Sequence, residues 1–338
     1  MLLFQKTIEM LKIGVLNIPS KCILAPMAGV ADFPFRLITR QAGCVFAFSE
    51  MISAKALAYR SKNTLRMIPS NPADRPIGLQ LLGEDEVSLG KALELANSFG
   101  FELIDFNAAC PVGKVTAKGA GAALLKAPAK LERLLKIMVR GAEAPVTLKI
   151  RAGWDERSVN AKNIALLAQD AGINALFIHG RTRVQGYRGR VDYAVIKEVK
   201  QALQIPVIAS GDCLSPQLVK KMFDETGCDG VAVARGALGN PWIFRDIQEY
   251  LKNGIVPERP SLDETANTMT RHLNLCIGEK GERRGVMLFR KYFVWYIRGL
   301  AEIRHYKEKA FKAATLQEMT ALIEEIRRSE KKIIIPPY

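Results

Sequence analysis

Short apolar runs rich in β-branched residues recur along the chain up to about residue 245, and stretches of helical character separate them. The eight runs span residues 22–27, 45–50, 76–83, 101–108, 145–153, 175–182, 205–212 and 230–237. Most do not alternate between apolar and polar positions, which is typical of parallel strands covered on both faces. The stretches between them, such as 84–100 and 158–172, have helical periodicity and end in glycine, a common helix C-cap.

Eight successive β–α units predict an α/β fold, a closed (β/α)8 TIM barrel, with an open doubly wound sheet as the alternative. A break follows at 252–264, where two prolines and a glycine precede Ser261, an N-cap candidate with Glu264 three residues on. Beyond it the pattern predicts helices at 262–280, 283–299, 302–312 and 315–331. We therefore expect a catalytic barrel over 1–252 and a small helical domain over 253–338.

Basic residues outnumber acidic ones by 49 to 34 in the 338 residues, which gives a net charge of +15. Such an excess suits a polyanionic partner, most simply nucleic acid. Nine basic residues lie within 283–312 against two acidic ones, and Tyr292, Trp295, Tyr296 and Tyr306 are interleaved with them. This region is predicted to bind RNA phosphates and stacked bases, unless the aromatic residues form a core and the basic ones a solvated face.

The N-terminus and the cysteines favour a cytoplasmic protein. No apolar run approaches the roughly 18 residues that span a bilayer. Lys6, Glu9 and Lys12 interrupt the N-terminal stretch where a signal peptide needs continuous apolar residues. None of the six cysteines forms a CxxC pair or a zinc-type cluster with histidine, so we expect free thiols and no metal.

Polar residues stand where the predicted strands end. The strand ends read Pro26-Met27-Ala28, Glu50, Gln80, Asn107, Lys149, His179, Ser210-Gly211-Asp212 and Ala234-Arg235-Gly236. The carboxyl ends of barrel strands face the active site, and a lysine or histidine on an apolar strand is costly unless it is paired. Any one of these residues has a structural explanation, but the set predicts an active site.

The residue types in this set suit a flavin mononucleotide. The loops "ASGD" (209–212) and "VARGAL" (233–238) offer backbone N–H groups to a phosphate, to which Arg235 adds a bidentate clamp. Gln80 and Asn107 offer amides to the edge of a heterocycle, and Lys149 is a cation that stabilises developing negative charge. The stretch "KGAGAALL" (118–125) lacks the third glycine of a dinucleotide fingerprint, so we interpret it as a loop that leads into a helix.

Cys110 ends the fourth apolar run, in "DFNAACPVGKV" (105–115). A cysteine by itself is most often an inert buried thiol. Its place among the polar strand ends predicts instead that this sulfur takes part in the chemistry.

Several of these motifs resemble the dihydrouridine synthase family, flavin enzymes that reduce uridine in transfer RNA, and the bacterial B-type most of all. The motifs are "LAPMAGVADFPFR", "LQLLG", "DFNAACPVGKV", "GAGAALL", "PVTLKIRAGW", "HGRTR", "IPVIASGD", "VARGALGNPWIF" and "FRKYFVWYIRGL", and the resemblance covers about residues 13–300. It implies FMN as cofactor, NADPH as reductant and tRNA as partner.

The resemblance also implies roles for individual residues. Pro26, Met27 and Ala28 would lie against the flavin, and Gln80, Lys149 and His179 would lie at its ring system. The phosphate would be held by Ser210, Gly211, Asp212, Ala234 and Arg235. Asn107 would lie near flavin and uracil, and Cys110 would be the catalytic acid. The sequence departs from the family where Ala108-Ala109 replaces the usual Met-Gly, Ser210 replaces Asn and Tyr292 replaces His. Because alanine has a Cβ, a positive φ at Ala109 would be strained.

The implied reaction sends hydride from reduced FMN to C6 of uracil and a proton from Cys110 to C5. A cysteine with a pKa of about 8.5 is mainly a neutral thiol at pH 7, so it is able to act as an acid. A cation beside the thiol would favour the thiolate, whereas the acid must stay protonated, so we expect Lys149 on the flavin side.

The residues expected to contact RNA are Arg181, Arg183, Arg283, Arg284, Arg290, Lys291 and Arg298. The alternatives are a flavin oxidoreductase acting on a free pyrimidine, similar to dihydroorotate dehydrogenases, and an RNA-binding relative without catalysis.

Overall fold

Eight parallel strands close into a barrel, and each coincides with one of the predicted apolar runs. The computed structural model describes residues 10–68, 71–300 and 303–329. The barrel strands are β3 (Cys22–Leu24), β4 (Ala47–Ser53), β5 (Ile77–Leu82), β6 (Leu103–Ala108), β7 (Val146–Arg151), β8 (Ala175–His179), β9 (Val207–Ser210) and β10 (Gly230–Val233). Because β10 pairs with β3 as well as with β9, the ring is closed. The prediction of a (β/α)8 barrel is confirmed, and the open-sheet alternative is wrong.

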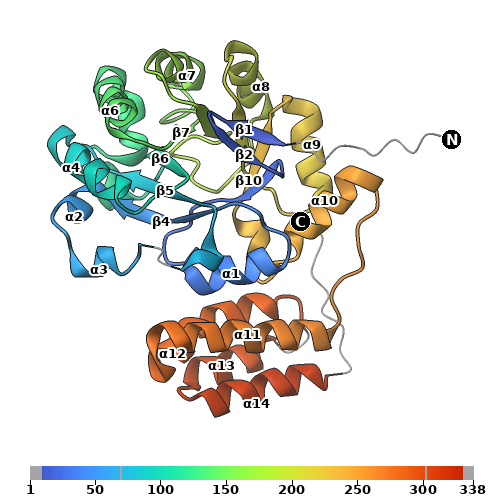
Figure 1. Ribbon diagram of the computed structural model, residues 1–338. Coiled ribbons are helices and arrows are strands. Elements are labelled where there is room, and N and C mark those ends of the chain that lie inside the picture. Colours follow the sequence, from blue (N-terminus) through green and yellow to red (C-terminus); the bar gives the residue numbers. More distant parts are fainter. Residues whose placement is uncertain (1–9, 69–70, 301–302, 330–338) are drawn as a thin grey trace. The chain divides into compact units, whose positions relative to one another are not determined.

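Helices cover the outer face of the strands. Those of the barrel unit are α2 (Ala54–Ala58), α3 (Lys62–Leu65), α4 (Glu86–Asn97), α5 (Gly113–Thr116), α6 (Pro128–Gly141), α7 (Ala161–Asp170), α8 (Tyr193–Ala202) and α9 (Pro216–Thr226). Figure 1 shows α6, α7 and α8 side by side along the barrel. The 3₁₀ turns are Pro72–Asp74, Gly121–Lys126 and Arg235–Ala237. The "KGAGAALL" stretch thus passes through a 3₁₀ turn into α6.

A short hairpin that the sequence pattern did not reveal closes the amino end of the barrel. Its strands are β1 (Leu11–Ile13) and β2 (Leu16–Ile18), which pair antiparallel. Leu11, Ile13 and Ile18 are buried in one cluster with Leu103 and Ala175, the first residues of β6 and β8. Three-residue strands are too short for a hydrophobic period to show. Because these side chains fill the amino end of the barrel, the candidate site lies at the carboxyl end.

The C-terminal helices form a second compact unit. Its helices are α1 (Phe33–Gln41), α10 (Ile243–Asn253), α11 (Leu262–Lys280), α12 (Glu282–Tyr296), α13 (Ile303–Lys312) and α14 (Leu316–Arg327). This unit comprises residues 34–43, 214–216 and 235 onward, which contact mainly one another, and the other residues form the barrel unit. The four helices predicted after residue 261 are all present, and the Ser261 hydroxyl accepts a hydrogen bond from Glu264 N at 3.1 Å. In the described ranges, no helix has the length and apolar character needed to cross a membrane.

A buried aromatic cluster forms the core of this unit, with His272 at its centre. The His272 ring lies 4.3 Å from that of Tyr292 and 5.5 Å from that of Phe289, measured between centroids. Tyr292 is 1% exposed and Tyr296 is 5% exposed, so neither is available to stack on an RNA base. For these two residues the prediction of a stacking role is wrong, because helix periodicity turns them towards α11. A close approach of α11 and α12 at Gly285, where a Cβ would lie 2.6 Å from the Ile277 backbone, completes the packing.

His272 predicts an acid-sensitive unit. Burial lowers the pKa of His272 to about 3, and the Nδ1 atom lies 3.1 Å from the Tyr296 hydroxyl. Because the unfolded chain takes up a proton near pH 6.5 and the folded chain does not, the free energy of unfolding falls by up to about 1.4 kcal/mol per pH unit as pH drops below 6.5. We expect urea unfolding at pH 7 and pH 5.5 to show this loss of about 1 kcal/mol in the native chain and not in His272→Phe. An equal loss in both chains would assign the acid sensitivity to other groups.

Candidate active site

Adjacent strands bring five of the predicted residues to the carboxyl half of the barrel. The strand registers pair Asn107 with Lys149 and His179 with Ser210, and Gln80 stands one strand before Asn107. Gln80, Asn107, His179 and Ser210 are buried at 2%, 6%, 8% and 6% exposure. The prediction that these side chains converge on one end of the barrel therefore agrees with their placement.

Lys149 extends from β7 to Ser210, the last residue of β9. Its Nζ donates to Ser210 Oγ at 3.1 Å, and Ser210 Oγ donates in turn to the Ile178 carbonyl. Desolvation lowers the pKa of Lys149 to about 8, although the charge of Asp105 opposes this shift. Burial raises the pKa of Asp105 to about 6, against hydrogen bonds from Gln80 and Thr147 and the charge of Lys149. The two opposite charges thus favour each other's ionised form.

Cys110 is half-buried, and its backbone is held on both sides. Asn107 Oδ1 accepts hydrogen bonds from Ala109 N at 3.0 Å and from Cys110 N at 2.8 Å. The Cys110 carbonyl accepts from Ala122 N at 3.1 Å. Arg151, a residue that sequence analysis did not single out, donates from Nε to the Ala109 carbonyl at 2.7 Å. The loop after β6 is thus fixed immediately around the thiol.

The conformation of this loop explains two features of the sequence. Ala109 is absent from the non-glycine residues with positive φ, which in the described chain are Arg60 and Asp212, so the alanine in place of the family's glycine causes no strain of that kind. Gly121 does have a positive φ of 59°, and a Cβ there would lie 2.8 Å from the Cys110 carbonyl oxygen. The glycine of "GAGAALL" therefore lets the next segment approach the cysteine.

Arg181 is part of the scaffold of the site. It is 2% exposed, and its guanidinium donates to both carboxylate oxygens of Asp212, at 3.0 and 2.5 Å, and to the carbonyls of Arg188 and Gly189. These bonds use its donors inside the protein, so we do not retain the expectation that Arg181 contacts RNA. The ion pair holds the β9 loop beside His179, where Gly211 has a φ of 119° and a Cβ would meet the imidazole at 2.9 Å.

The remaining predicted cofactor residues lie on the loops after β3 and β10. Pro26 and Met27 are half-buried and Ala28 is exposed in a turn that the Met27 carbonyl closes by accepting from Val30 N and Ala31 N. Ala234 and Arg235 follow Val233, the last residue of β10, directly.

The donors of this site fit the predicted flavin. Lys149 has three N–H donors, and the structure gives its Nζ one hydrogen bond, to Ser210. A half-buried ammonium with spare donors, next to amide and imidazole groups, suits a ring system with several acceptor atoms. The residues present are thus compatible with FMN.

Cations and an aromatic ring lie on the loops around the barrel mouth. Lys126 Nζ lies 4.0 Å from the centre of the Trp154 ring, and Arg183 Cζ lies 4.7 Å from it. Arg183 Nε is buried without a hydrogen-bond partner among the described residues, and Nη2 is 3.4 Å from the Thr116 hydroxyl. Tyr187, on the same loop as Arg183, is 60% exposed. Positive charge and exposed ring faces are what single-stranded RNA requires of a protein surface.

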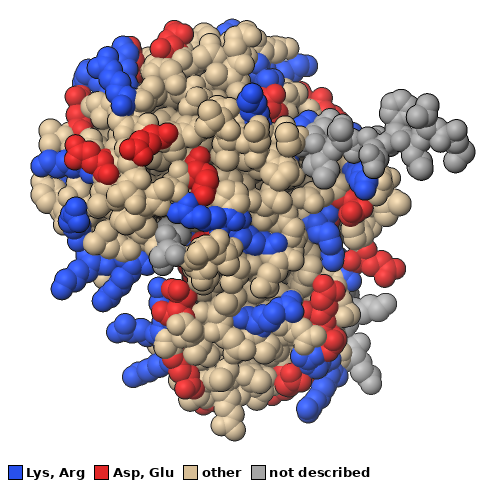
Figure 2. All heavy atoms as spheres, viewed as in Figure 1, with Lys and Arg blue, Asp and Glu red and all other residues tan. Residues whose placement is uncertain are grey.

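The basic residues of the helical unit are partly compensated. Arg283 and Arg284 are exposed, Lys291 and Arg298 are half-buried, and Arg290 donates to the Ala313 carbonyl at 2.6 and 2.9 Å. Lys309 pairs with Glu325 of α14 at 3.0 Å. Figure 2 shows side chains of both signs on the visible face of this unit. Some of the positive charge of the segment 283–312 is therefore offset by Glu325 of α14.

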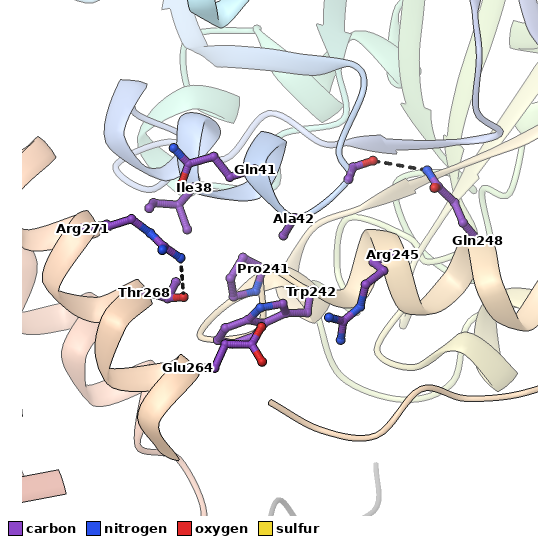
Figure 3. Close-up of a pocket in the computed structure, with 11 residues that line it drawn as sticks. Ile38, Gln41, Ala42, Pro241, Trp242, Arg245, Gln248, Glu264, Thr268 and Arg271 are labelled. Carbon is purple, nitrogen blue, oxygen red and sulfur yellow. Dashed lines mark hydrogen bonds between the residues drawn. The ribbon is translucent and has the colours of Figure 1, made fainter. Parts of the chain in front are cut away.

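A polar pocket lies within the helical unit. Arg271 of α11 donates to the Thr268 hydroxyl at 3.0 Å, Arg245 of α10 pairs with Asp246, and Glu264 lines the same hollow. Figure 3 shows Arg245, Glu264, Thr268 and Arg271 around Trp242. Because the carboxylate of Glu264 offsets the arginines, the pocket carries no strong charge of one sign.

Comparison with known proteins identifies relatives over most of the chain. The family model described as "Dihydrouridine synthase (Dus)" matches residues 23–331. A tRNA-dihydrouridine synthase B from Pseudomonas aeruginosa is 38% identical over 88% of this chain and 90% of its own length. The protein of that name from Vibrio vulnificus is 40% identical over 91% and 96%, respectively.

Solved structures share the fold at low identity. An old yellow enzyme homologue from Zymomonas mobilis superimposes with a TM-score of 0.54 at 12% identity, over 75% of this chain and 94% of that one. Morphinone reductase gives a TM-score of 0.54 at 14% identity, over 77% and 92%. At such identities the likeness concerns the fold alone.

Proposed function

Because the chain belongs to the dihydrouridine synthase family, we propose that it reduces uridines of transfer RNA to 5,6-dihydrouridine with FMN as cofactor and NADPH as reductant. The observation that carries this proposal is the rigidly held Cys110 at the carboxyl end of the barrel, in the loop after β6, the strand that pairs with the strand of Lys149. Relatives that share 38–40% of their residues are named for this activity.

The flavin would be bound by residues from most of the barrel strands. We assign Pro26, Met27 and Ala28 to one face of the ring, and Gln80, Lys149 and His179 to its polar atoms. Asn107 would lie near the ring, and Ser210, Gly211, Asp212, Ala234 and Arg235 at the phosphate. Asp212 contributes through its backbone, because its carboxylate is already paired with Arg181. When bound, the reduced flavin supplies the hydride for C6 of uracil.

The protein supplies the proton and compensates the charge. Adding hydride to C6 leaves negative charge spread over C5 and the C4 carbonyl, and the Cys110 thiol donates its proton to C5. Lys149, as a cation held at Ser210, would stabilise this negative charge. Its position at Ser210 rather than at Cys110 supports the separation of acid and cation that the reaction requires.

RNA binding would involve both parts of the chain. A uridine in folded RNA must leave its stack to enter the barrel, at a cost of a few kcal/mol, which contacts elsewhere offset. We assign this role to Arg183 and its neighbours Lys126 and Trp154 at the mouth. On the helical domain from residue 253, the exposed Arg283 and Arg284, with Arg290, Lys291 and Arg298, are the candidates.

Two measurements on the purified protein test the proposal. We expect a flavin absorption spectrum, and we expect NADPH-dependent formation of dihydrouridine in tRNA that lacks the modification. Reduction of free uridine or orotate but not of tRNA would instead support an enzyme for free pyrimidines. Binding of tRNA by a protein that does not bind FMN would support a relative without catalysis.

Arg183 gives a specific prediction for RNA binding. We expect Arg183→Ala to weaken tRNA affinity and to reduce the slope of log K against log salt by about 1, because one phosphate contact is lost. Filter binding at several salt concentrations measures both effects. Arg133→Ala on α6, which removes an equally charged residue paired with Glu86 on the outer helices, is the matched control and should leave the slope unchanged.

A further inference from the structure

A chain of side-chain hydrogen bonds runs through the barrel interior to the catalytic loop. Its first member is Asp105, in the middle of β6, whose carboxylate accepts from Thr147 Oγ1 and from Gln80 Nε2, both at 2.7 Å. Gln80 Oε1 then accepts from Asn107 Nδ2 at 2.8 Å. Asn107 Oδ1 accepts the two backbone N–H groups of Ala109 and Cys110.

Strand register brings these residues together. Asp105 stands opposite Gln80 on one side and Thr147 on the other, and Asn107 follows Asp105 by two residues on the same face of β6. Asp105 is 1% exposed and Thr147 is 0% exposed. A buried carboxylate is expensive, and no step of the proposed reaction uses it directly. Its retention therefore requires another explanation.

The groups at the two ends of this hydrogen-bond chain fix how the amides of Gln80 and Asn107 are turned. One end is the Asp105 carboxylate, and the other is the backbone N–H groups of Ala109 and Cys110. An ionised carboxylate only accepts hydrogen bonds, so Gln80 must turn its nitrogen towards Asp105 and its oxygen towards Asn107. Asn107 must then turn its nitrogen towards Gln80, which leaves its oxygen for the backbone of Cys110. Both carboxylate oxygens of Asp105 accept hydrogen bonds, one from Gln80 and the other from Thr147, as an ionised carboxylate does.

We propose that Asp105 is a positioning residue for proton transfer: through Gln80 and Asn107 it anchors the backbone of Cys110. This inference rests on the proposed function, in which the Cys110 thiol is the proton donor. Asp105 touches neither the thiol nor, in this assignment, the substrate. Its effect is to keep the amide of Asn107 from rotating away from the loop.

A competing explanation is that Asp105 acts through its charge on Lys149, since the two groups interact electrostatically. Two substitutions separate these roles. Asp105→Leu removes both the acceptor and the charge, whereas Asp105→Asn removes the charge but keeps an oxygen for Gln80, because the Thr147 hydroxyl is able to accept from the new amide. If Asp105 anchors the loop, Asp105→Asn should retain the amide protection and the reaction rate that Asp105→Leu loses.

The first readout does not depend on activity. We expect the amide hydrogens of Ala109 and Cys110 to exchange about tenfold faster in Asp105→Leu, the equivalent of one lost hydrogen bond, and within about threefold of the native rate in Asp105→Asn. Gln80→Leu, which cuts the chain one link nearer to Cys110, should give the same loss as Asp105→Leu. Thr147→Val removes a bond from the other carboxylate oxygen and should leave the exchange unchanged. Native protection in both Leu variants would overturn the proposal.

The second readout is the single-turnover oxidation of reduced flavin by tRNA, in the native and Cys110→Ala backgrounds. Asp105→Leu is expected to slow this step about tenfold in the native background and less than about twofold when Cys110 is absent. An equal loss in both backgrounds, or a loss in Asp105→Asn as large as in Asp105→Leu, would assign Asp105 to Lys149 and overturn the inference. A protein without flavin or without tRNA reduction would refute the proposed function, while the exchange measurements would still decide the role of Asp105.

Discussion

Cys110→Ala is expected to slow the reduction of uridine in tRNA by about 10³-fold at pH 7, within the range for removal of a general acid. The substitution deletes the sulfur and leaves the loop intact, because Asn107 and Ala122 hold the backbone of residue 110 and not its side chain. Reduction of the flavin by NADPH needs no proton for C5 and should keep its rate. Rapid-mixing experiments on the two half-reactions separate these effects.

A buried cysteine away from the mouth provides the control. Cys228 lies just before the amino end of β10, at 5% exposure, and its N–H donates to Thr226. Cys228→Ala should preserve both half-reactions. Full activity of Cys110→Ala towards tRNA would remove the thiol from the mechanism, even with FMN bound.

The parts of the fold that follow from repeated patterns were predictable from sequence. Buried parallel strands are continuously apolar, so all eight appear in the sequence, and α11 begins and ends where the capping and periodicity indicate. The hairpin of β1 and β2 was not predictable, because two three-residue strands leave too little pattern. Tyr292 and Tyr296 were assigned to RNA because spacing alone does not show which face of a helix meets a neighbour.

The residues of the candidate site likewise divide into those that the sequence pattern could identify and those that it could not. Residues at strand ends could be identified because the barrel topology places all of them at one end. Asp105 and Arg151 could not, because their importance lies in contacts between strands and loops: Asp105 with Gln80, and Arg151 with the Ala109 carbonyl. Arg181 was assigned to RNA on its charge and loop position, and only the bidentate pair with Asp212 reveals its structural role.

Lys149→Met is expected to reduce kcat/KM for tRNA about 100-fold at pH 7, the usual effect of losing one group that stabilises developing charge. The pH profile provides the sharper test. Because desolvation lowers the pKa of Lys149 to about 8, the cation is present below that pH and is lost as pH rises through it. The kcat/KM of the native enzyme should therefore fall above pH 8, since this parameter reports the free enzyme. Because the Cys110 thiol must also keep its proton, the role of Lys149 is tested in the Cys110→Ala background, where Lys149→Met should remove the remaining fall above pH 8.

Lys136→Met removes the same charge from an exposed position on α6, where Lys136 pairs with Glu132, and it should retain the native profile. In the Cys110→Ala background, a fall above pH 8 that persists in Lys149→Met would mean that another group titrates there. The cation would then act by binding alone, and its loss would appear in KM with kcat unchanged. The proposed role in stabilising developing charge predicts the opposite: because Lys149 is held by its hydrogen bond to Ser210 on β9, it is in place for the negative charge of the reacting ring, and so its loss should appear in kcat.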